Sequence, residues 1–313
     1  MPTFSDEIKQ KAIEIGFHKI GIVPAEPLNV EYAHLKDWLA RGFHGEMAWM
    51  EREPEKRSDP RLLFYEAKTV IVVALNYFTG HEHKNNAEKG KISRYAWGDD
   101  YHDVVREKLA ELLIWIKTQD PSATGKICVD TAPMMDKAWA VRAGLGWLGK
   151  HSNLITTDIG SWVFIGEILL DLELEYDTAI VEDHCGTCTA CLDACPTNAI
   201  VEPYVVDSRK CISYATIELR DEKLPADVSA NMEGWFYGCD ICQDVCPWNR
   251  FEQQSGESRF EPRMGETSLD LEEIADMPHE DYVTRFRRSA IKRTKLTGLK
   301  RNASALKHES IKS

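Results

Sequence analysis

The sequence predicts an α+β fold built from three consecutive parts. Segments with helical and with strand periodicity are mixed over about residues 1–175. Eight of the nine cysteines lie within the 62 residues from Cys185 to Cys246, and the chain then becomes basic. We therefore expect a mixed domain at 1–175, a cysteine module at 176–255 and a mainly helical basic segment at 256–313.

Helices are predicted where apolar residues recur every three to four positions and a helix breaker follows. The first covers residues 4–15, with Phe4, Ile8 and Ala12 on one face and Gly16 after its end. The same criteria predict further helices over residues 29–41, 99–119 and 133–143.

Strands are predicted where short apolar runs lie between turn residues. They are expected at residues 17–23, 69–78 and 127–129, followed by a strand pair at 152–157 and 161–170. Residues 51–61, which are charged and bounded by prolines, are expected to form a loop. The polar residues 80–91 are expected to form a second, mobile loop.

Composition limits the class of protein. The chain is 43% hydrophobic and 28% charged, which is ordinary for a globular protein. The net charge of −13 excludes a general nucleic-acid binder, so any nucleic-acid contact must be local. The N-terminus lacks the basic and apolar stretches of a signal peptide, and the longest apolar runs are too short to cross a bilayer. We expect a cytoplasmic protein without membrane spans.

The cysteines follow the spacing of a bacterial two-cluster ferredoxin. The first run, Cys-x2-Cys-x2-Cys-x3-Cys-Pro, extends from Cys185 to Cys195, and in such ferredoxins its fourth cysteine binds the other cluster. The second run, from Cys239 to Cys246, also ends before a proline but has one cysteine fewer, and Cys211 supplies the missing thiolate.

This spacing predicts two 4Fe–4S clusters with interleaved ligands. The ligands of the first cluster are Cys185, Cys188, Cys191 and Cys246. The ligands of the second are Cys195, Cys211, Cys239 and Cys242. Two zinc sites are the alternative, but zinc favours separate pairs of cysteines, and disulfides are not expected in a chain without an export signal. Two adjacent clusters conduct electrons, so the large first domain is expected to hold the centre where chemistry occurs.

The first domain has no standard nucleotide signature. The run Gly144–Lys150 has Gly-x-Gly-x-x-Gly spacing but follows a helix rather than a strand, so we expect a tight loop that a bulky ligand approaches closely. Cobalamin is a candidate, but the segment nearest to its usual signature, Asp100–Val105, lacks the required glycine. His102 is therefore expected on a helix surface, and Cys128 is expected to be a buried small hydrophobic residue.

Several segments together resemble the epoxyqueuosine reductase family. They are Val129–Pro133, Ala140–Lys150, Cys185–Pro196, Cys211–Tyr214 and Tyr237–Cys242, with Glu55–Arg57 and Ala96–His102 in support. The resemblance covers roughly residues 5–305. It implies a fold like that of reductive dehalogenases, in which a cobalamin-binding α/β core precedes the ferredoxin-like module. It also implies reduction of epoxyqueuosine to queuosine at the wobble position of tRNA, with cobalamin and electrons from two 4Fe–4S clusters.

The resemblance also implies a proton donor. An epoxide oxygen leaves as water only if its developing alkoxide is protonated, and a carboxylic acid can do this. The family's aspartate corresponds to Asp130, whose pKa would be raised by burial beside the corrin. Taken alone, the spacing favours Asp130 as a cap of the helix that begins near Pro133. Asp136 is a weaker candidate, expected on the surface of that helix.

For cobalamin, the family pattern corresponds to seven positions of this chain. They are Arg57, Ser93, Asp130, Lys150, Ser152, Asn153 and Ser213. Asp240 and Ile241 are added because they adjoin a cluster ligand and electrons must pass from a cluster to the corrin. The alternative for Arg57 is a solvated loop arginine.

The stretch Arg285–Arg301 is the expected contact with tRNA. It holds eight Lys or Arg residues and no acid, so with a total of −13 the remainder of the chain carries −21. Basic side chains there could neutralise phosphates, and such binding weakens with salt. The predicted contacts are Arg287, Arg288, Lys292, Arg293, Lys295, Lys300 and Arg301. A solvated charged tail is the alternative.

Two other functions stay open at this stage. A reductive dehalogenase-like enzyme acting on a small molecule would give the basic stretch no role. A non-catalytic iron–sulfur electron carrier would need neither cobalamin nor Asp130. The leading hypothesis requires two partners, a tRNA anticodon stem-loop carrying epoxyqueuosine and a low-potential electron donor.

Overall fold

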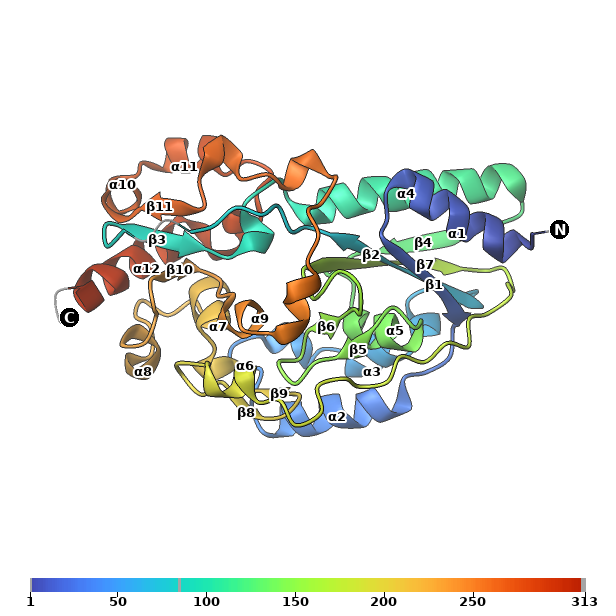
Figure 1. Cartoon of the computed structure of the whole chain (residues 1–313), viewed down its shortest axis with the longest axis horizontal. Helices are drawn as coiled ribbons and strands as arrows, with labels where there is room; N and C mark the ends of the chain where they lie inside the picture. The colour runs from blue at the N-terminus through green and yellow to red at the C-terminus, as the bar shows by residue number, and fades with distance from the viewer. Residues whose placement is uncertain (1, 84–85, 311–313) are drawn as a thin grey trace.

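The computed structural model, which describes residues 2–83 and 86–310, is built around a four-stranded antiparallel sheet (Figure 1). The strand order is β1-β2-β7-β4. These strands are β1 (Lys19–Pro24), β2 (Thr69–Asn76), β7 (Val163–Leu170) and β4 (Gly125–Cys128). β2 and β7 pair along their whole length, from Thr69 opposite Leu170 to Asn76 opposite Val163. The antiparallel order, which the sequence did not reveal, makes the domain α+β, as predicted.

Helices cover both faces of this sheet, which explains why every residue of β2 is buried. Ile71 and Val73 of β2 pack against α1 (Phe4–Ile15) and α4 (Tyr101–Gln119). Val70 and Val72 face α5 (Asp136–Arg142), which lies on the opposite side (Figure 1). The two remaining helices of the first half are α2 (Asn29–Ala40) and α3 (Pro54–Ser58).

The rest of the chain is made of short elements. The cysteine module contains α6 (Ala190–Asp193), β8 (Ile200–Glu202), β9 (Val205–Val206), α7 (Ile212–Ile217), α8 (Ala226–Ser229), β10 (Trp235–Tyr237) and α9 (Ile241–Asp244). The last part contains β11 (Ser268–Asp270), α10 (Leu271–Asp276), α11 (His279–Arg285) and α12 (Lys295–Ser310).

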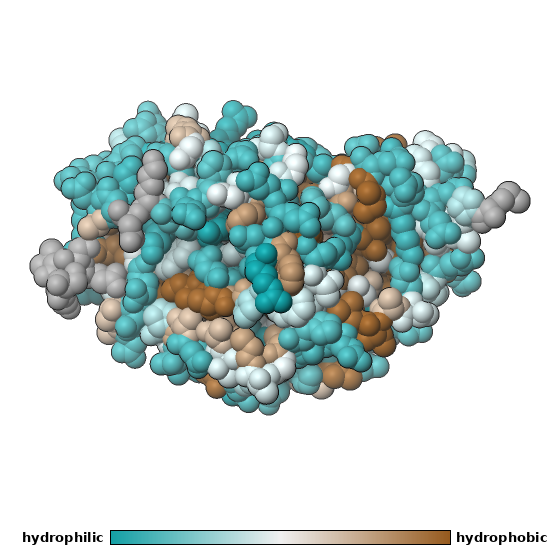
Figure 2. All heavy atoms as spheres, in the orientation of Figure 1, coloured by the Kyte–Doolittle hydropathy of each residue, from teal (hydrophilic) through white to brown (hydrophobic). Residues whose placement is uncertain are grey.

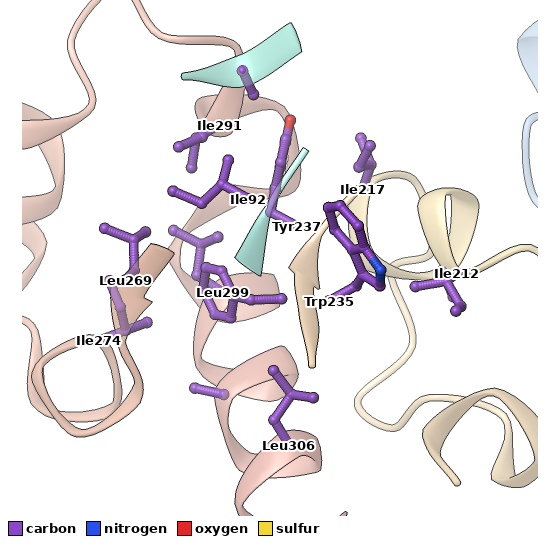
Figure 3. Close-up of a cluster of buried hydrophobic side chains, with 14 of the residues drawn as sticks. Ile92, Ile212, Ile217, Trp235, Tyr237, Leu269, Ile274, Ile291, Leu299 and Leu306 are labelled. Atoms are coloured by element: carbon purple, nitrogen blue, oxygen red, sulfur yellow. The ribbon is translucent and has the colours of Figure 1, made fainter. Parts of the chain in front are cut away.

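A second sheet joins all three parts of the chain. β3 (Lys89–Ile92), from the first part, pairs in parallel with β10 and antiparallel with β11. Figure 3 shows the cluster beneath it, where Ile92 lies close to Tyr237 of β10 and Leu299 of α12. The boundaries expected near residues 175 and 255 stay predictions, but strands from either side of them share this sheet.

Several local expectations were wrong. The predicted strand pair at 152–157 and 161–170 does not form, because β6 (Leu154–Ile155) pairs with β5 (Trp147–Leu148) while β7 pairs with β2 and β4. The loop expected at 51–61 contains α3. The loop expected at 80–91 ends in β3, and residues 84–85 lie outside the described part.

The glycine-rich run serves the β5–β6 hairpin rather than a ligand. A Cβ at Gly146 would collide with the carbonyl oxygen of Ile155, and one at Gly149 would meet the Ile155 side chain at 2.5 Å. Gly144 has a φ of +72° and lies against Ala179. The expected close approach of a bulky ligand is therefore replaced by a close approach of the chain to itself.

Figure 2 shows a mainly hydrophilic face with separate hydrophobic patches. Among the residues that the structure describes, no helix is long and apolar enough to cross a membrane.

Candidate active site and cluster pockets

A cavity of about 480 Å³ lies between the central sheet and the cysteine module. Its lining includes Asp130, the start of α5 at Asp136 and the start of β7 from the first part of the chain. The module contributes four of its cysteines. They are Cys195, Cys211, Cys239 and Cys242. This set of four is the one that the spacing predicted for the second cluster.

The other four cysteines line a second cavity, of about 170 Å³. They are Cys185, Cys188, Cys191 and Cys246. All nine cysteines are free thiols, and Cys128 is buried in the core, as expected. The predicted division of the ligands therefore coincides with two separate cavities.

The thiols suit clusters better than single ions. Within the described residues, no three His, Cys, Asp or Glu side chains form a group that could hold one metal ion. Zinc would need four sulfurs within about 2.3 Å of one point. Here each set of four thiols lines a cavity, which is the arrangement that a larger polynuclear group requires.

Asp130 follows β4 and is held by the start of α4. Tyr101 Oη donates a hydrogen bond of 2.6 Å to Asp130 Oδ2, and His102 Nε2 lies 3.1 Å from the same oxygen. Tyr101 is fixed in turn by stacking on Phe164 of β7, with ring centroids 4.4 Å apart. Asp130 does not cap α5, because the N-cap residue is Met135 and accepts no side-chain bond. The capping alternative is thus excluded.

His102 bridges two carboxylates. Its Nδ1 is 2.7 Å from Asp100 Oδ1 and its Nε2 is 3.1 Å from Asp130 Oδ2. Both ring nitrogens face acceptors, so the geometry requires the doubly protonated imidazolium. Burial alone would lower the pKa of His102, but the bonds to Asp100 and Asp130 raise it to about 9. The expectation of a helix-surface residue was wrong, since the side chain is only 22% exposed.

The expected raised pKa of Asp130 is also corrected. Burial raises this pKa, but the hydrogen bonds from His102 and Tyr101 outweigh burial and leave it below its ordinary value. Asp130 therefore rests as a carboxylate beside an imidazolium. Because the carboxyl group of Asp130 is ionised at rest, it can donate a proton only after it has accepted one from a neighbouring residue.

Asp136 and Lys137 open α5 at the wall of the cavity. Asp136 lines the cavity instead of lying on the helix surface as expected, and burial raises its pKa. Lys137, which the sequence reading missed, donates to Ser152 O at 2.8 Å and to Asn153 Oδ1 at 2.7 Å. The sequence signal that could have placed both residues at the site was their nearness to Asp130, which they follow by six and seven positions.

Of the other residues predicted to bind cobalamin, six line the large cavity. They are Ser93, Ser152, Asn153, Ser213, Asp240 and Ile241. Ser93 Oγ donates to the buried Asp240 carboxylate, and the backbone N–H of Arg94 adds a bond of 2.8 Å. Lys150 lies elsewhere, because its Nζ binds the carbonyls of Gly186 and Cys188 and so holds the loop of the first cluster.

Arg57 is not a solvated loop arginine. It is 8% exposed, donates to the carbonyl of Trp49 at 3.2 Å and lies over the Trp49 ring. Its Nε is buried without a partner in the described structure. The charges of Asp130 and Asp136 act on this guanidinium, which places an unused donor beside the cavity.

The basic stretch is anchored beside Asp130. The carbonyl of Arg288 accepts a bond of 2.9 Å from the N–H of Asp100, the N-cap residue of α4. Arg287 and Lys292 are exposed, and among the described residues neither side chain forms an ion pair. Lys295 is exposed and Lys300 partly buried.

Other cations of this stretch form ion pairs or hydrogen bonds within the protein. Arg288 pairs with Asp103 and Glu107, and Arg293 pairs with Glu218. Arg301 points inward and donates to the carbonyls of Ala215, Leu219 and Asp221. From the sequence, all of these basic side chains were predicted to contact tRNA. In the structure, Arg288, Arg293 and Arg301 are engaged within the protein, so fewer cations remain available to bind phosphates.

Known proteins share both the sequence and the arrangement. The model of the family described as "Epoxyqueuosine reductase QueG, DUF1730" matches residues 57–131. An epoxyqueuosine reductase of Cellulophaga algicola is 49% identical over 306 residues, covering 97% of this chain and 98% of that protein. One from Synechocystis is 50% identical, covering 91% and 99%. The chain belongs to the epoxyqueuosine reductase family. It is therefore an oxidoreductase, and the resemblance drawn from its motifs is confirmed.

Solved structures of epoxyqueuosine reductases support the fold. One, in complex with an epoxyqueuosine-modified tRNA-Tyr stem loop, has a TM-score of 0.90 at 30% identity and covers 97% of this chain and 81% of its own. The Bacillus subtilis enzyme, with an aspartate-bearing catalytic loop swung out of its active site, has a TM-score of 0.88. A model of a 4Fe-4S double cluster binding domain matches residues 184–249, so this epoxyqueuosine reductase family member has the predicted two-cluster module.

Proposed function

We propose that the protein reduces epoxyqueuosine to queuosine at the wobble position of tRNA, in the cytoplasm, with cobalamin and two 4Fe–4S clusters. The observation that carries this proposal is the large cavity, where Asp130 and the four cysteines assigned to the second cluster meet beside a basic surface. The family relationship supports the substrate, since a relative has been crystallised with an epoxyqueuosine-modified stem loop.

The cavity residues fit a bound cobalamin. The hydroxyl and amide groups of Ser152, Asn153 and Ser213 on the cavity wall are suited to its polar side chains. The unpartnered Nε of Arg57, outside this lining, is a further donor near Asp130 and Asp136. Cobalamin bound there would supply a low-potential redox centre for reduction of the epoxide. Cys242, Asp240 and Ile241 line the same cavity, so the second cluster would lie next to that centre.

The protein's own residues manage protons and position the substrate. His102 holds a proton within hydrogen-bond distance of Asp130, so this pair can pass one proton to the oxygen that leaves the epoxide. Tyr101 fixes the orientation of the carboxylate. The free basic side chains Arg287 and Lys292 would bind phosphates of the stem loop and bring the modified base to the cavity.

The decisive experiment uses anaerobically reconstituted protein with both clusters and cobalamin. A tRNA stem loop carrying epoxyqueuosine is added with a strong one-electron reductant, and the nucleosides are analysed by mass spectrometry. Loss of one oxygen atom from the modified base supports the proposal. Retained cobalamin with turnover of organohalides but not of the stem loop would favour the dehalogenase-like alternative. Intact clusters with no cobalamin retained would favour the electron carrier.

A further inference from the structure

Beneath the cavity, Glu167 is buried without a visible counter-charge. It lies in the middle of β7 and is 0% exposed. Neither of its carboxylate oxygens has a hydrogen-bond partner in the described structure, and Oδ1 of the neighbouring Asp136 also lacks one. Leaving such oxygens unsatisfied would cost several kcal/mol if both groups were charged.

Within the described part of the chain, no cation forms an ion pair with Glu167 or Asp136. The titratable or charged residues that act on it are Asp130, Lys137, Arg57, Tyr101 and Cys128. Lys137 directs its amino group to the carbonyl of Ser152 and the amide of Asn153. Arg57 donates to the carbonyl of Trp49, and its Nε has no partner in the described structure. Asp130 adds a further negative charge.

A shared proton satisfies both carboxyl groups. If Glu167 carries it, its O–H donates to Asp136, and two of the three otherwise unpaired oxygens become a donor and an acceptor. Two adjacent carboxylates in a water-excluded site cannot both ionise near neutral pH. In agreement, burial and the charge of Asp136 raise the pKa of Glu167 well above its usual value, and burial raises that of Asp136.

The reaction under "Proposed function" has a use for this proton. Converting an epoxide to an alkene breaks two C–O bonds and forms water, which takes two electrons and two protons. The electrons come from a low-potential one-electron donor through the clusters. The Asp130–His102 pair holds one proton in the hydrogen-bond geometry. The second proton needs another donor at the cavity wall.

We propose that Glu167 and Asp136 form a proton store that supplies this second proton, with Asp136 delivering it into the cavity toward Asp130. Asp136 lines the cavity together with Asp130, whereas Glu167 lies behind it and acts only through it. The inference rests on the proposed function for its role in turnover. The existence of the shared proton does not depend on that function.

The test compares Glu167→Gln and Asp136→Asn with Cys128→Ser as a matched control. Cys128 lies opposite Glu167 in the β4–β7 register and is equally buried, but it is outside the carboxyl pair. Infrared spectroscopy at pH 7 measures the C=O band of a protonated carboxyl group in the holoenzyme. Steady-state turnover of the epoxyqueuosine stem loop measures kcat and KM separately.

We expect the band in the wild type and in Cys128→Ser, and its loss in Glu167→Gln. Both pair variants should lower kcat by about 10-fold to 100-fold with KM nearly unchanged, because general acid catalysis typically contributes at least that much. A band that persists in Glu167→Gln, or a full kcat in Asp136→Asn, would overturn the proposal. If Glu167→Gln does not fold, the kcat of Asp136→Asn tests the proposal instead. This variant should fold more readily, because Asp136 lies at the cavity wall and Glu167 is fully buried. A wild type with the band but no turnover would refute the proposed function and leave the shared proton standing.

Discussion

Asp130 illustrates how much a single residue depends on its neighbours. The segment that contains it was identified from its resemblance to a family, yet the direction of its pKa shift was predicted incorrectly. The donors responsible, Tyr101 and His102, lie 29 and 28 positions away in the sequence, so no local pattern could reveal them.

Asp130→Asn should abolish most turnover while leaving the fold intact. The amide cannot pass a proton, and general acid catalysis typically contributes roughly 10²–10⁴-fold, so kcat should fall by about that factor. Single-turnover conversion of the epoxyqueuosine stem loop measures this, with retention of both clusters as the control. A variant with wild-type kcat would remove Asp130 from the mechanism.

The ion network of His102 should make stability depend on pH. The pKa of His102 in the folded protein, about 9, lies above its ordinary 6.5, so its stabilisation is full below about pH 6.5 and disappears as pH rises through 9. At most it amounts to about 3 kcal/mol. Thermal unfolding of the wild type and of His102→Gln at pH 6 and pH 9.5 checks this. The difference between the two proteins should be large at pH 6 and small at pH 9.5, and an equal difference at both values would contradict it.

At the level of elements, the helices were easier to predict than the pairing of strands. The helix expected at residues 4–15 was confirmed at those bounds, because its capping residues and apolar face are local. The partners of β3 could not be predicted, because β10 and β11 lie more than 140 residues further along the chain.

The β5–β6 hairpin offers a test of the glycine-rich run. Gly146→Ala should destabilise the protein by about 1–3 kcal/mol, the usual cost of overpacking, since the new methyl group would strike the backbone of Ile155. It should also weaken cobalamin binding, because the hairpin connection carries Ser152 and Asn153 to the cavity. Thermal unfolding and spectroscopic titration measure the two effects.

Gly256→Ala is the matched control for this experiment. Nothing lies within 4 Å of a Cβ built at Gly256, and its φ is not in the left-handed range. It should therefore behave like the wild type in both measurements. If Gly146→Ala did so too, the hairpin would tolerate the side chain and the packing argument would fail.

At the scale of the whole molecule, an acidic protein must bind a polyanion through a small surface. The total charge is −13, and internal ion pairs occupy Arg288 and Arg293. We therefore expect tRNA binding to depend steeply on salt, with the slope set by the few cations that remain free.

Charge reversal measures this directly. Arg287→Glu and Lys292→Glu should each weaken stem-loop binding and reduce the slope of log Kd against log salt by about one. Lys117→Glu is the control, because Lys117 is exposed on α4 about 20 Å along the helix from Asp103. Fluorescence anisotropy between low and physiological salt gives both quantities. Equal losses in all three variants would indicate a general charge effect and no local tRNA surface.

The pairing of β3 has a consequence for how the protein is made. The central sheet needs only residues 19–170 and can form while the ribosome is still translating the cysteine module. β3 must wait first for β10 and then for β11, so residues 89–92 have no partner strand until position 237 has left the exit tunnel, and they are fully paired only after position 270. Ser93, which follows β3 and holds Asp240 at the cavity, can take its place only once Asp240 has emerged. The nascent chain thus exposes an open strand edge during synthesis, and the pocket closes only after the cysteines that line it have emerged.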